Sequence, residues 1–331
     1  MNISYKHESI RLTGRWDTRD PRVATATATG SYIEFAFEGK MAVARFDVLT
    51  NAYPRLHLWI SLDGGDMFSA PIDSHLRIIA KENGKHVCRI IYKGGTEQDR
   101  RWYSPLTGKV SFIGVQVDNP AELPADERKT IEFVGDSITE GVLIDVDFYD
   151  KDSDFISSQD QNNRCYQDDV CATYAWQTAE ALNLRPIFMG YGAVGVTRAG
   201  CGKVPPATEA YPYNFDGSPI TREQPDYILI NHGANDRPKP VEEYLEKYAA
   251  LLDVIRSMNP DATLISLSAF CGAFHEELGK MIAEYNEKNG CNVHFIDSNG
   301  WIPLSPLHPL RDGHTTVAKN LIPLLKEIIE D

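Results

Sequence analysis

Apolar and polar residues alternate along the first 120 or so residues in short runs typical of β-strands. Turns rich in Gly, Asp or Asn separate the runs, and no helix-length periodic segment interrupts them. The alternation covers residues 31–39, 41–48, 55–65, 75–80, 86–95 and 109–117. Their spacing of roughly 10 to 15 residues predicts an antiparallel β-sandwich over residues 1–122.

The pattern changes after residues 118–130, which are rich in Pro and charge and are typical of a linker. Apolar strands then alternate with helical segments, and the clearest helix covers 241–259. The strands are predicted at 130–135, 185–192, 226–233, 263–270 and 292–298. This order indicates a doubly wound α/β domain over 123–331, with a parallel sheet buried on both faces. Ligands bind such sheets beyond the carboxyl ends of their strands.

Composition narrows the classes of function. The chain has 331 residues, 42% of them hydrophobic and 24% charged, as is ordinary for soluble globular proteins. A net charge of −14 argues against a nucleic-acid partner, and the lack of a long apolar run argues against a membrane partner. The N-terminal segment lacks the apolar core of a secretory signal, and the six cysteines lack paired spacing. We therefore expect reduced thiols in a cytoplasmic protein.

The sequence implies no metal and no cofactor. The acidic run at 150–155 begins like a calcium loop, but position six is Phe155 and position twelve is Gln161, where Gly and Glu are needed. The segment "FHEEL" at 274–278 lacks the His-Glu-x-x-His spacing of a zinc site.

Three turns follow the first three strands of the second half. Ser137 lies in "FVGDSITEG", Gly195 in "GYGAVGVTR" and Asn235 in "NHGANDR". Each turn alone has a structural explanation, as a helix cap, a tight turn or an Asx turn. Because the carboxyl ends of parallel strands meet at one edge of the sheet, we expect the three turns to lie together.

Together with the C-terminal stretch "SPLHPLRDGHTTVA", these turns resemble the four blocks of the SGNH hydrolases, also called the GDSL esterase family. The blocks are Gly135-Asp136-Ser137, Gly195, Gly233-Ala234-Asn235-Asp236, and His308-Pro309 followed by Gly313-His314. The resemblance covers 130–331 and implies that Ser137 is the nucleophile of an ester hydrolase. It also implies an oxyanion hole formed by the backbone N–H groups of Ser137 and Gly195 and the amide of Asn235.

The resemblance assigns the base to His308, in the family's His-Pro position, and places His314 at the start of the last helix. Three residues before the base the family has Asp, whereas this chain has Ser305. Either a backbone carbonyl orients His308 in a Ser–His dyad, or another carboxylate replaces the missing one. Asp312 and Asp297 are the nearest candidates. We favour the dyad, although a weakened or inactive site stays an alternative.

The first half narrows the resemblance further. The segments "LTGRWD" (12–17), "GSYIEFAFEG" (30–39) and "ISLDGG" (60–65) resemble the N-terminal jelly-roll of carbohydrate esterase family 2. That family removes acetyl groups from plant polysaccharides and oligosaccharides, and some members lack the triad Asp. The resemblance implies a serine O-acetylesterase for acetylated sugars such as xylo- or manno-oligosaccharides.

Two long segments, 142–169 and 201–224, leave the rim where the site is expected. They carry aromatic residues suited to sugar rings, and Trp301 and Tyr211 are the predicted substrate contacts. Other hypotheses are an SGNH lipase or thioesterase for other short acyl esters, and a non-catalytic carbohydrate-binding protein. The oligomeric state, a homo-oligomer included, is left open by the sequence.

Overall fold

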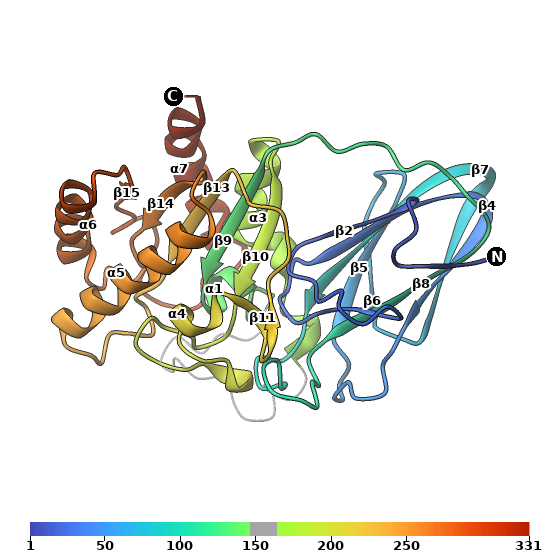
Figure 1. Ribbon diagram of the computed structural model, residues 1–331, viewed down its shortest axis with the longest axis horizontal. Coiled ribbons are helices and arrows are strands. Elements are labelled where there is room, and N and C mark those ends of the chain that lie inside the picture. Colours follow the sequence, from blue (N-terminus) through green and yellow to red (C-terminus); the bar gives the residue numbers. More distant parts are fainter. Residues whose placement is uncertain (146–163, 331) are drawn as a thin grey trace.

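The computed structural model describes residues 1–145 and 164–330. It contains an antiparallel sheet in the first part of the chain and a parallel sheet in the second (Figure 1). No helix in the described ranges is both long and apolar enough to cross a membrane.

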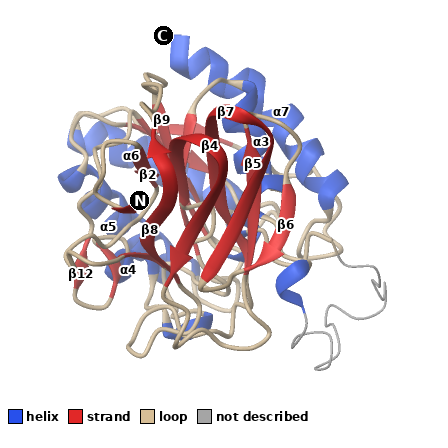
Figure 2. Ribbon diagram, turned by 90° about the vertical axis from the view of Figure 1, so that its right-hand side faces the viewer, coloured by secondary structure: helices blue, strands red, loops and turns tan. Residues whose placement is uncertain are grey.

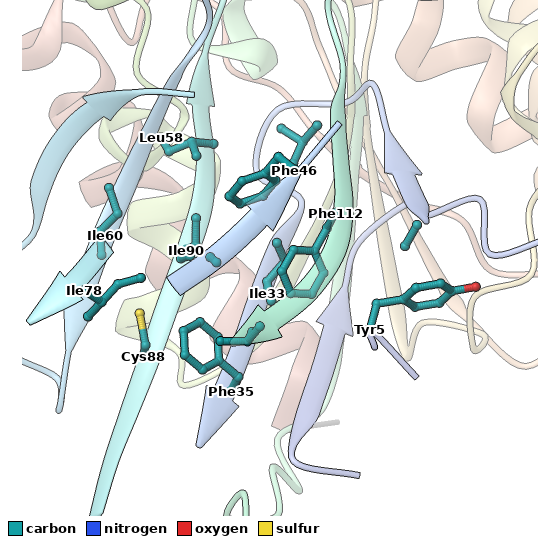
Figure 3. Close-up of a cluster of buried hydrophobic side chains, with 14 of the residues drawn as sticks. Tyr5, Ile33, Phe35, Phe46, Leu58, Ile60, Ile78, Cys88, Ile90 and Phe112 are labelled. Carbon is teal, nitrogen blue, oxygen red and sulfur yellow. The ribbon is translucent and has the colours of Figure 1, made fainter. Parts of the chain in front are cut away.

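The antiparallel sheet has eight strands in the order β1-β8-β4-β7-β5-β6, with β2 beside β4 and β3 beside β8. The strands are β1 (Asn2–Ser4), β2 (Ile10–Thr13), β3 (Ala24–Ala26), β4 (Tyr32–Phe46), β5 (His57–Leu62), β6 (Phe68–Pro71), β7 (His75–Gly94) and β8 (Val110–Pro120). Figure 2 faces this sheet, and Figure 3 shows Phe35, Phe46 and Phe112 among the buried side chains that it encloses. The predicted antiparallel β-sandwich is confirmed.

In two places, a pair of predicted strands forms one long strand in the structure. The predicted strands 31–39 and 41–48 both overlap β4 (Tyr32–Phe46), and the predicted strands 75–80 and 86–95 both overlap β7 (His75–Gly94). Gly39 pairs with Gly84, and the register between β4 and β7 shifts between Gly39 and Met41. A bulge bends a strand without ending it, which is why glycines that look like turns in the sequence lie inside these strands.

The parallel sheet has five strands in the order β10-β9-β13-β14-β15. They are β9 (Thr130–Gly135), β10 (Arg185–Gly190), β13 (Tyr227–Asn231), β14 (Thr263–Leu267) and β15 (His294–Ile296). Helices α3 (Tyr174–Ala181) and α7 (Arg311–Glu330) pack on one face, and α5 (Val241–Met258) and α6 (His275–Asn289) pack on the other. The predicted doubly wound domain is confirmed.

Short elements gather near the carboxyl ends of the parallel strands. They are α1 (Ser137–Glu140), η1 (Arg164–Tyr166), η2 (Val170–Ala172), η3 (Cys201–Lys203), α4 (Ala207–Ala210), β11 (Tyr213–Phe215) and β12 (Ser218–Pro219). The connection from β8 to β9 runs past the opposite end of the sheet (Figure 1). The predicted division at residues 122 and 123 lies in this connection, and two separately folding domains stay a prediction.

The sandwich packs against the edge of the parallel sheet through aromatic and ionic contacts. Tyr32 of β4 meets Trp176 of α3 with ring centroids 6.2 Å apart. A Cβ added to Gly30 would lie 2.3 Å from the Phe188 ring, so only glycine permits this approach. Arg15 also pairs with Glu132 of β9, with Nε 2.9 Å from Oε1 and both side chains buried.

Candidate active site

The turn from β9 into α1 places Ser137 at the carboxyl end of the sheet. Asp136 caps α1, because its carboxylate accepts the Ile138 N–H at 2.9 Å. Gly135 precedes it, and a Cβ there would lie 2.2 Å from the Thr139 hydroxyl. The helix is four residues long, and Gly141, whose φ is 90°, caps its C-terminal end. This tight turn fixes Ser137 at the first helical position, where its backbone N–H has no partner within the helix.

Ser137 and His308 meet at this edge of the sheet. Ser137 Oγ lies 2.8 Å from His308 Nε2, although 171 positions separate the two residues in the chain. At this distance an imidazole can take the hydroxyl proton as the oxygen attacks a carbonyl carbon. The structure therefore joins the predicted nucleophile and the predicted base.

Asn235 lines the same cavity as Ser137. Its Nδ2 donates to the Val194 carbonyl at 3.1 Å and to Asp136 Oδ2 at 3.2 Å. Burial raises the pKa of Asp136 to about 7, and the nearby Asp236 carboxylate adds to the rise, while the Ile138 N–H opposes it. Asp136 therefore positions two parts of the site, the helix that carries Ser137 and the amide of Asn235.

The predicted role of Gly195 does not fit the structure. Its N–H donates to the Arg198 carbonyl at 3.1 Å, and a Cβ at Gly195 would lie 2.4 Å from Asp236 Oδ1. Asp236 in turn accepts the Thr197 N–H at 2.8 Å. Gly195 is therefore needed for close packing over a carboxylate, and its N–H is not available to an oxyanion. The residue of this loop that borders the site is Ala193, in the left-handed region with φ 58°.

A cavity of about 80 Å³ opens beside Ser137 and His308. Ala193, Ala234 and Asn235 form part of its wall, and Glu97 reaches it from the loop after β7. The sequence analysis missed Glu97, because a single acidic residue in "GGTEQDRR" carries no local signal of a site. Only the packing of the sandwich against the parallel sheet brings it there.

Comparison with known proteins identifies the family. Residues 133–316, more than half of the chain, match the GDSL-like Lipase/Acylhydrolase family. The chain belongs to this family. It is 25% identical over 264 residues to a Cellvibrio japonicus protein named acetylxylan esterase / glucomannan deacetylase, and the match covers 75% of this chain and 68% of the relative.

Solved structures of two carbohydrate esterases share the whole fold. A family two carbohydrate esterase from Cellvibrio japonicus has a TM-score of 0.80 at 20% identity, with 100% of this chain and 98% of that chain covered. An acetyl xylan esterase from Butyrivibrio proteoclasticus has a TM-score of 0.78 at 20% identity, with coverage of 100% and 99%. Both parts of this GDSL-family chain, the sandwich and the parallel sheet, therefore occur together in known structures.

His314 of this GDSL-family chain is buried in the first turn of α7 and bonds Tyr174. Its Nδ1 accepts the Tyr174 N–H at 3.1 Å, and its ring stacks on the Tyr174 ring. Burial lowers the pKa of His314 to about 3, and the neighbouring His308 contributes. A neutral imidazole held in this way supports the start of the helix, as the sequence predicts.

The two candidate carboxylates contact other groups. Asp297 accepts the Ser268 hydroxyl at 3.0 Å and lies 3.1 Å from His275 Nδ1. Asp312 is exposed and accepts the Gly313 N–H at 2.8 Å. Both carboxylates therefore bond groups other than His308, and a third member of the site stays a prediction.

Replacing Asp312 with alanine is therefore expected to keep kcat/KM for 4-nitrophenyl acetate within about threefold of the wild-type value, because exposed surface substitutions have small effects. Steady-state kinetics with this chromogenic ester measures the change. A loss of 100-fold or more, in contrast, would show that Asp312 orients His308 during the reaction.

Of the two predicted aromatic contacts, Tyr211 is wrong and Trp301 stays a prediction. Tyr211 is fully buried, its hydroxyl donates to Glu132 Oε2 at 2.7 Å, and its ring lies under the Arg15 guanidinium. Trp301 is half-buried against the α3–α7 side of the core and does not line the cavity. An aromatic residue near the rim of a site can equally anchor its own segment, and the buried contacts of Tyr211 show that it does so here.

Residues 146–163 lie outside the described part of the chain, and with them most of the first long rim segment and the acidic run at 150–155. Across residues 1–145 and 164–330, no group of His, Cys, Asp and Glu side chains is arranged to hold a metal ion.

Proposed function

We propose that the protein is a serine O-acetylesterase that removes acetyl groups from acetylated sugars. The observation that carries this proposal is the 2.8 Å contact between Ser137 Oγ and His308 Nε2 beside a cavity of about 80 Å³. One water molecule needs about 10–15 Å³ of such space, so the cavity has room for a group of a few heavy atoms. An acetyl group has three.

The reaction follows from the positions of these residues. His308 takes the proton of Ser137 as Oγ forms a bond to the acetyl carbon, and the carbonyl oxygen becomes an oxyanion. The Ser137 N–H and the Asn235 amide are the donors proposed for this oxyanion, and one such donor contributes roughly 3 kcal/mol. The Asn235 amide donates to Asp136 Oδ2 and to the Val194 carbonyl, so it must exchange one of these contacts for the oxyanion. The bond to the sugar oxygen then breaks, and that oxygen takes the proton from His308.

The second half of the cycle regenerates Ser137. A water molecule gives a proton to His308 and attacks the acetyl-enzyme, the bond to Oγ breaks, and Oγ regains the proton as acetate leaves. Because Asp297 and Asp312 bond other groups, we infer that the cycle runs without either of them. The Ser–His dyad stays our interpretation of the site.

The Cellvibrio japonicus relative, named for acetylxylan and glucomannan, supports xylan and mannan esters as the substrate class. The test is an acetate-release assay on acetylated xylan, acetylated mannan and their oligosaccharides. Acetate is expected from at least one of them. If every glycan is inert while 4-nitrophenyl acetate is cleaved, the sugar assignment is wrong and the general esterase assignment survives.

The length of the acyl chain separates this proposal from a lipase or thioesterase. We expect kcat/KM for 4-nitrophenyl octanoate to be about 100-fold or more below that for the acetate, because each extra methylene without space in a pocket is penalised strongly. Steady-state kinetics across the acetate, butyrate, hexanoate and octanoate esters measures the trend. A rate that rises with chain length would instead favour a lipase.

A further inference from the structure

The loop that follows β7 belongs to the sandwich in sequence but to the active site in space. It starts after Gly94, and three residues later Glu97 lines the same cavity as Ser137 and His308. A Cβ added to Gly192 would lie 2.2 Å from Glu97 Oε2, so the carboxylate rests directly against the turn after β10.

Buried contacts on both sides of Glu97 hold this loop in place. Arg101 is fully buried, forms an ion pair with Glu140, and donates to the Thr96 carbonyl at 2.9 Å. The Arg101 N–H also donates to the Gly202 carbonyl at 3.2 Å. Glu140 is the last residue of α1, the helix that starts with Ser137. One short helix therefore fixes both the nucleophile and the loop that presents Glu97.

We propose that Glu97 contacts the substrate and accepts hydrogen bonds from sugar hydroxyls next to the acetyl ester. This inference rests on the proposed function and extends it, because it makes the sandwich part of the substrate site. A carboxylate offers about four acceptor positions, so contacts to protein groups leave room for a sugar. Sugar hydroxyls are donors, and hydrogen bonds to a charged acceptor are the stronger kind. Backbone anchoring on both sides keeps the acceptor preorganised.

The test compares two substrates in the full-length protein. Glu97→Gln keeps the shape of the side chain and removes its charge, whereas 4-nitrophenyl acetate has no hydroxyl beside its ester. We expect kcat/KM for an acetylated xylo-oligosaccharide to fall about tenfold to 100-fold, the range for a lost charge-assisted bond. For 4-nitrophenyl acetate the loss should be several-fold smaller, because this ester offers Glu97 no hydroxyl. Glu82→Gln makes the same change at an exposed position of β7 and should match the wild type on both substrates.

Each other outcome overturns the inference. An unchanged rate on the oligosaccharide would show that Glu97 makes no useful contact with the sugar. An equal loss on both substrates would show that Glu97 supports the structure of the site and does not contact the sugar. In that case Glu97→Asp, which keeps the charge, would not restore the rate on the oligosaccharide more than the rate on 4-nitrophenyl acetate. If the wild-type protein cleaves only the phenyl ester, the proposed function itself fails, and the wild-type control alone shows it.

Discussion

Replacing Ser137 or His308 with alanine is expected to lower kcat/KM for 4-nitrophenyl acetate by about 10⁴-fold or more. The serine hydroxyl is a weak nucleophile at neutral pH, and the 2.8 Å contact to His308 Nε2 supplies the base that it needs. Steady-state kinetics on each purified variant measures the loss, with circular dichroism to confirm folding.

The double variant sharpens this prediction. Because the two residues act as a unit, Ser137→Ala combined with His308→Ala should cost little more than either change alone. The Asp312→Ala variant, which alters an exposed residue of the same C-terminal block, is the matched control. Near-normal turnover in His308→Ala would contradict the assignment of the base.

Glu132→Gln is expected to lower the free energy of unfolding by about 3–5 kcal/mol at pH 7, because removing one partner leaves buried charges without compensation. Glu132 is fully buried in β9 and faces Arg15 Nε at 2.9 Å and Arg222 Nε at 3.0 Å. The substitution removes the charge that both guanidinium groups share. Urea denaturation followed by circular dichroism measures the difference.

The pH dependence of this difference has a definite sign. Burial alone would raise the pKa of Glu132, but the charges of Arg15 and Arg222 outweigh it and lower the pKa from 4.5 to about 2. The stabilisation by the carboxylate is therefore complete above about pH 4.5 and is lost as the pH falls toward 2. The stabilities of the wild type and Glu132→Gln should converge at low pH.

Glu243→Gln is the control for this pair of measurements. Glu243 pairs with Lys239 at the helix surface at 2.8 Å, and exposed pairs contribute little to stability. We expect a change well below that of Glu132→Gln at every pH. If Glu132→Gln is as stable as the wild type at pH 7, the buried ion pairs do not join the two parts of the molecule as the structure indicates.

The sequence was sufficient for the features that depend on local order along the chain. Alternation and apolar runs predicted both sheets, since side-chain periodicity reflects which faces are buried. The order of the turns after β9, β10 and β13 placed Ser137 and Asn235 at one edge of the sheet. The C-terminal block added His308, which the structure brings to Ser137.

Features that depend on packing between distant segments were not predictable in the same way. Glu97 reaches the cavity, and Arg101 reaches Glu140 of α1, only because the sandwich is docked against the parallel sheet. Gly195 and Ala193 lie in one short loop, and only its hydrogen bonds show which residue faces the cavity. Tyr211 is an aromatic residue of the type that contacts sugars, yet its hydroxyl donates to the buried Glu132 carboxylate.

Labelling with a serine-reactive fluorophosphonate, followed by peptide mapping, tests the activated nucleophile. One equivalent of label is expected on Ser137 in the wild-type protein, and labelling should slow sharply in His308→Ala because the hydroxyl then lacks its proton acceptor. An unlabelled wild-type protein, or label on a different serine, would contradict the assignment and favour a non-catalytic carbohydrate-binding protein or another site.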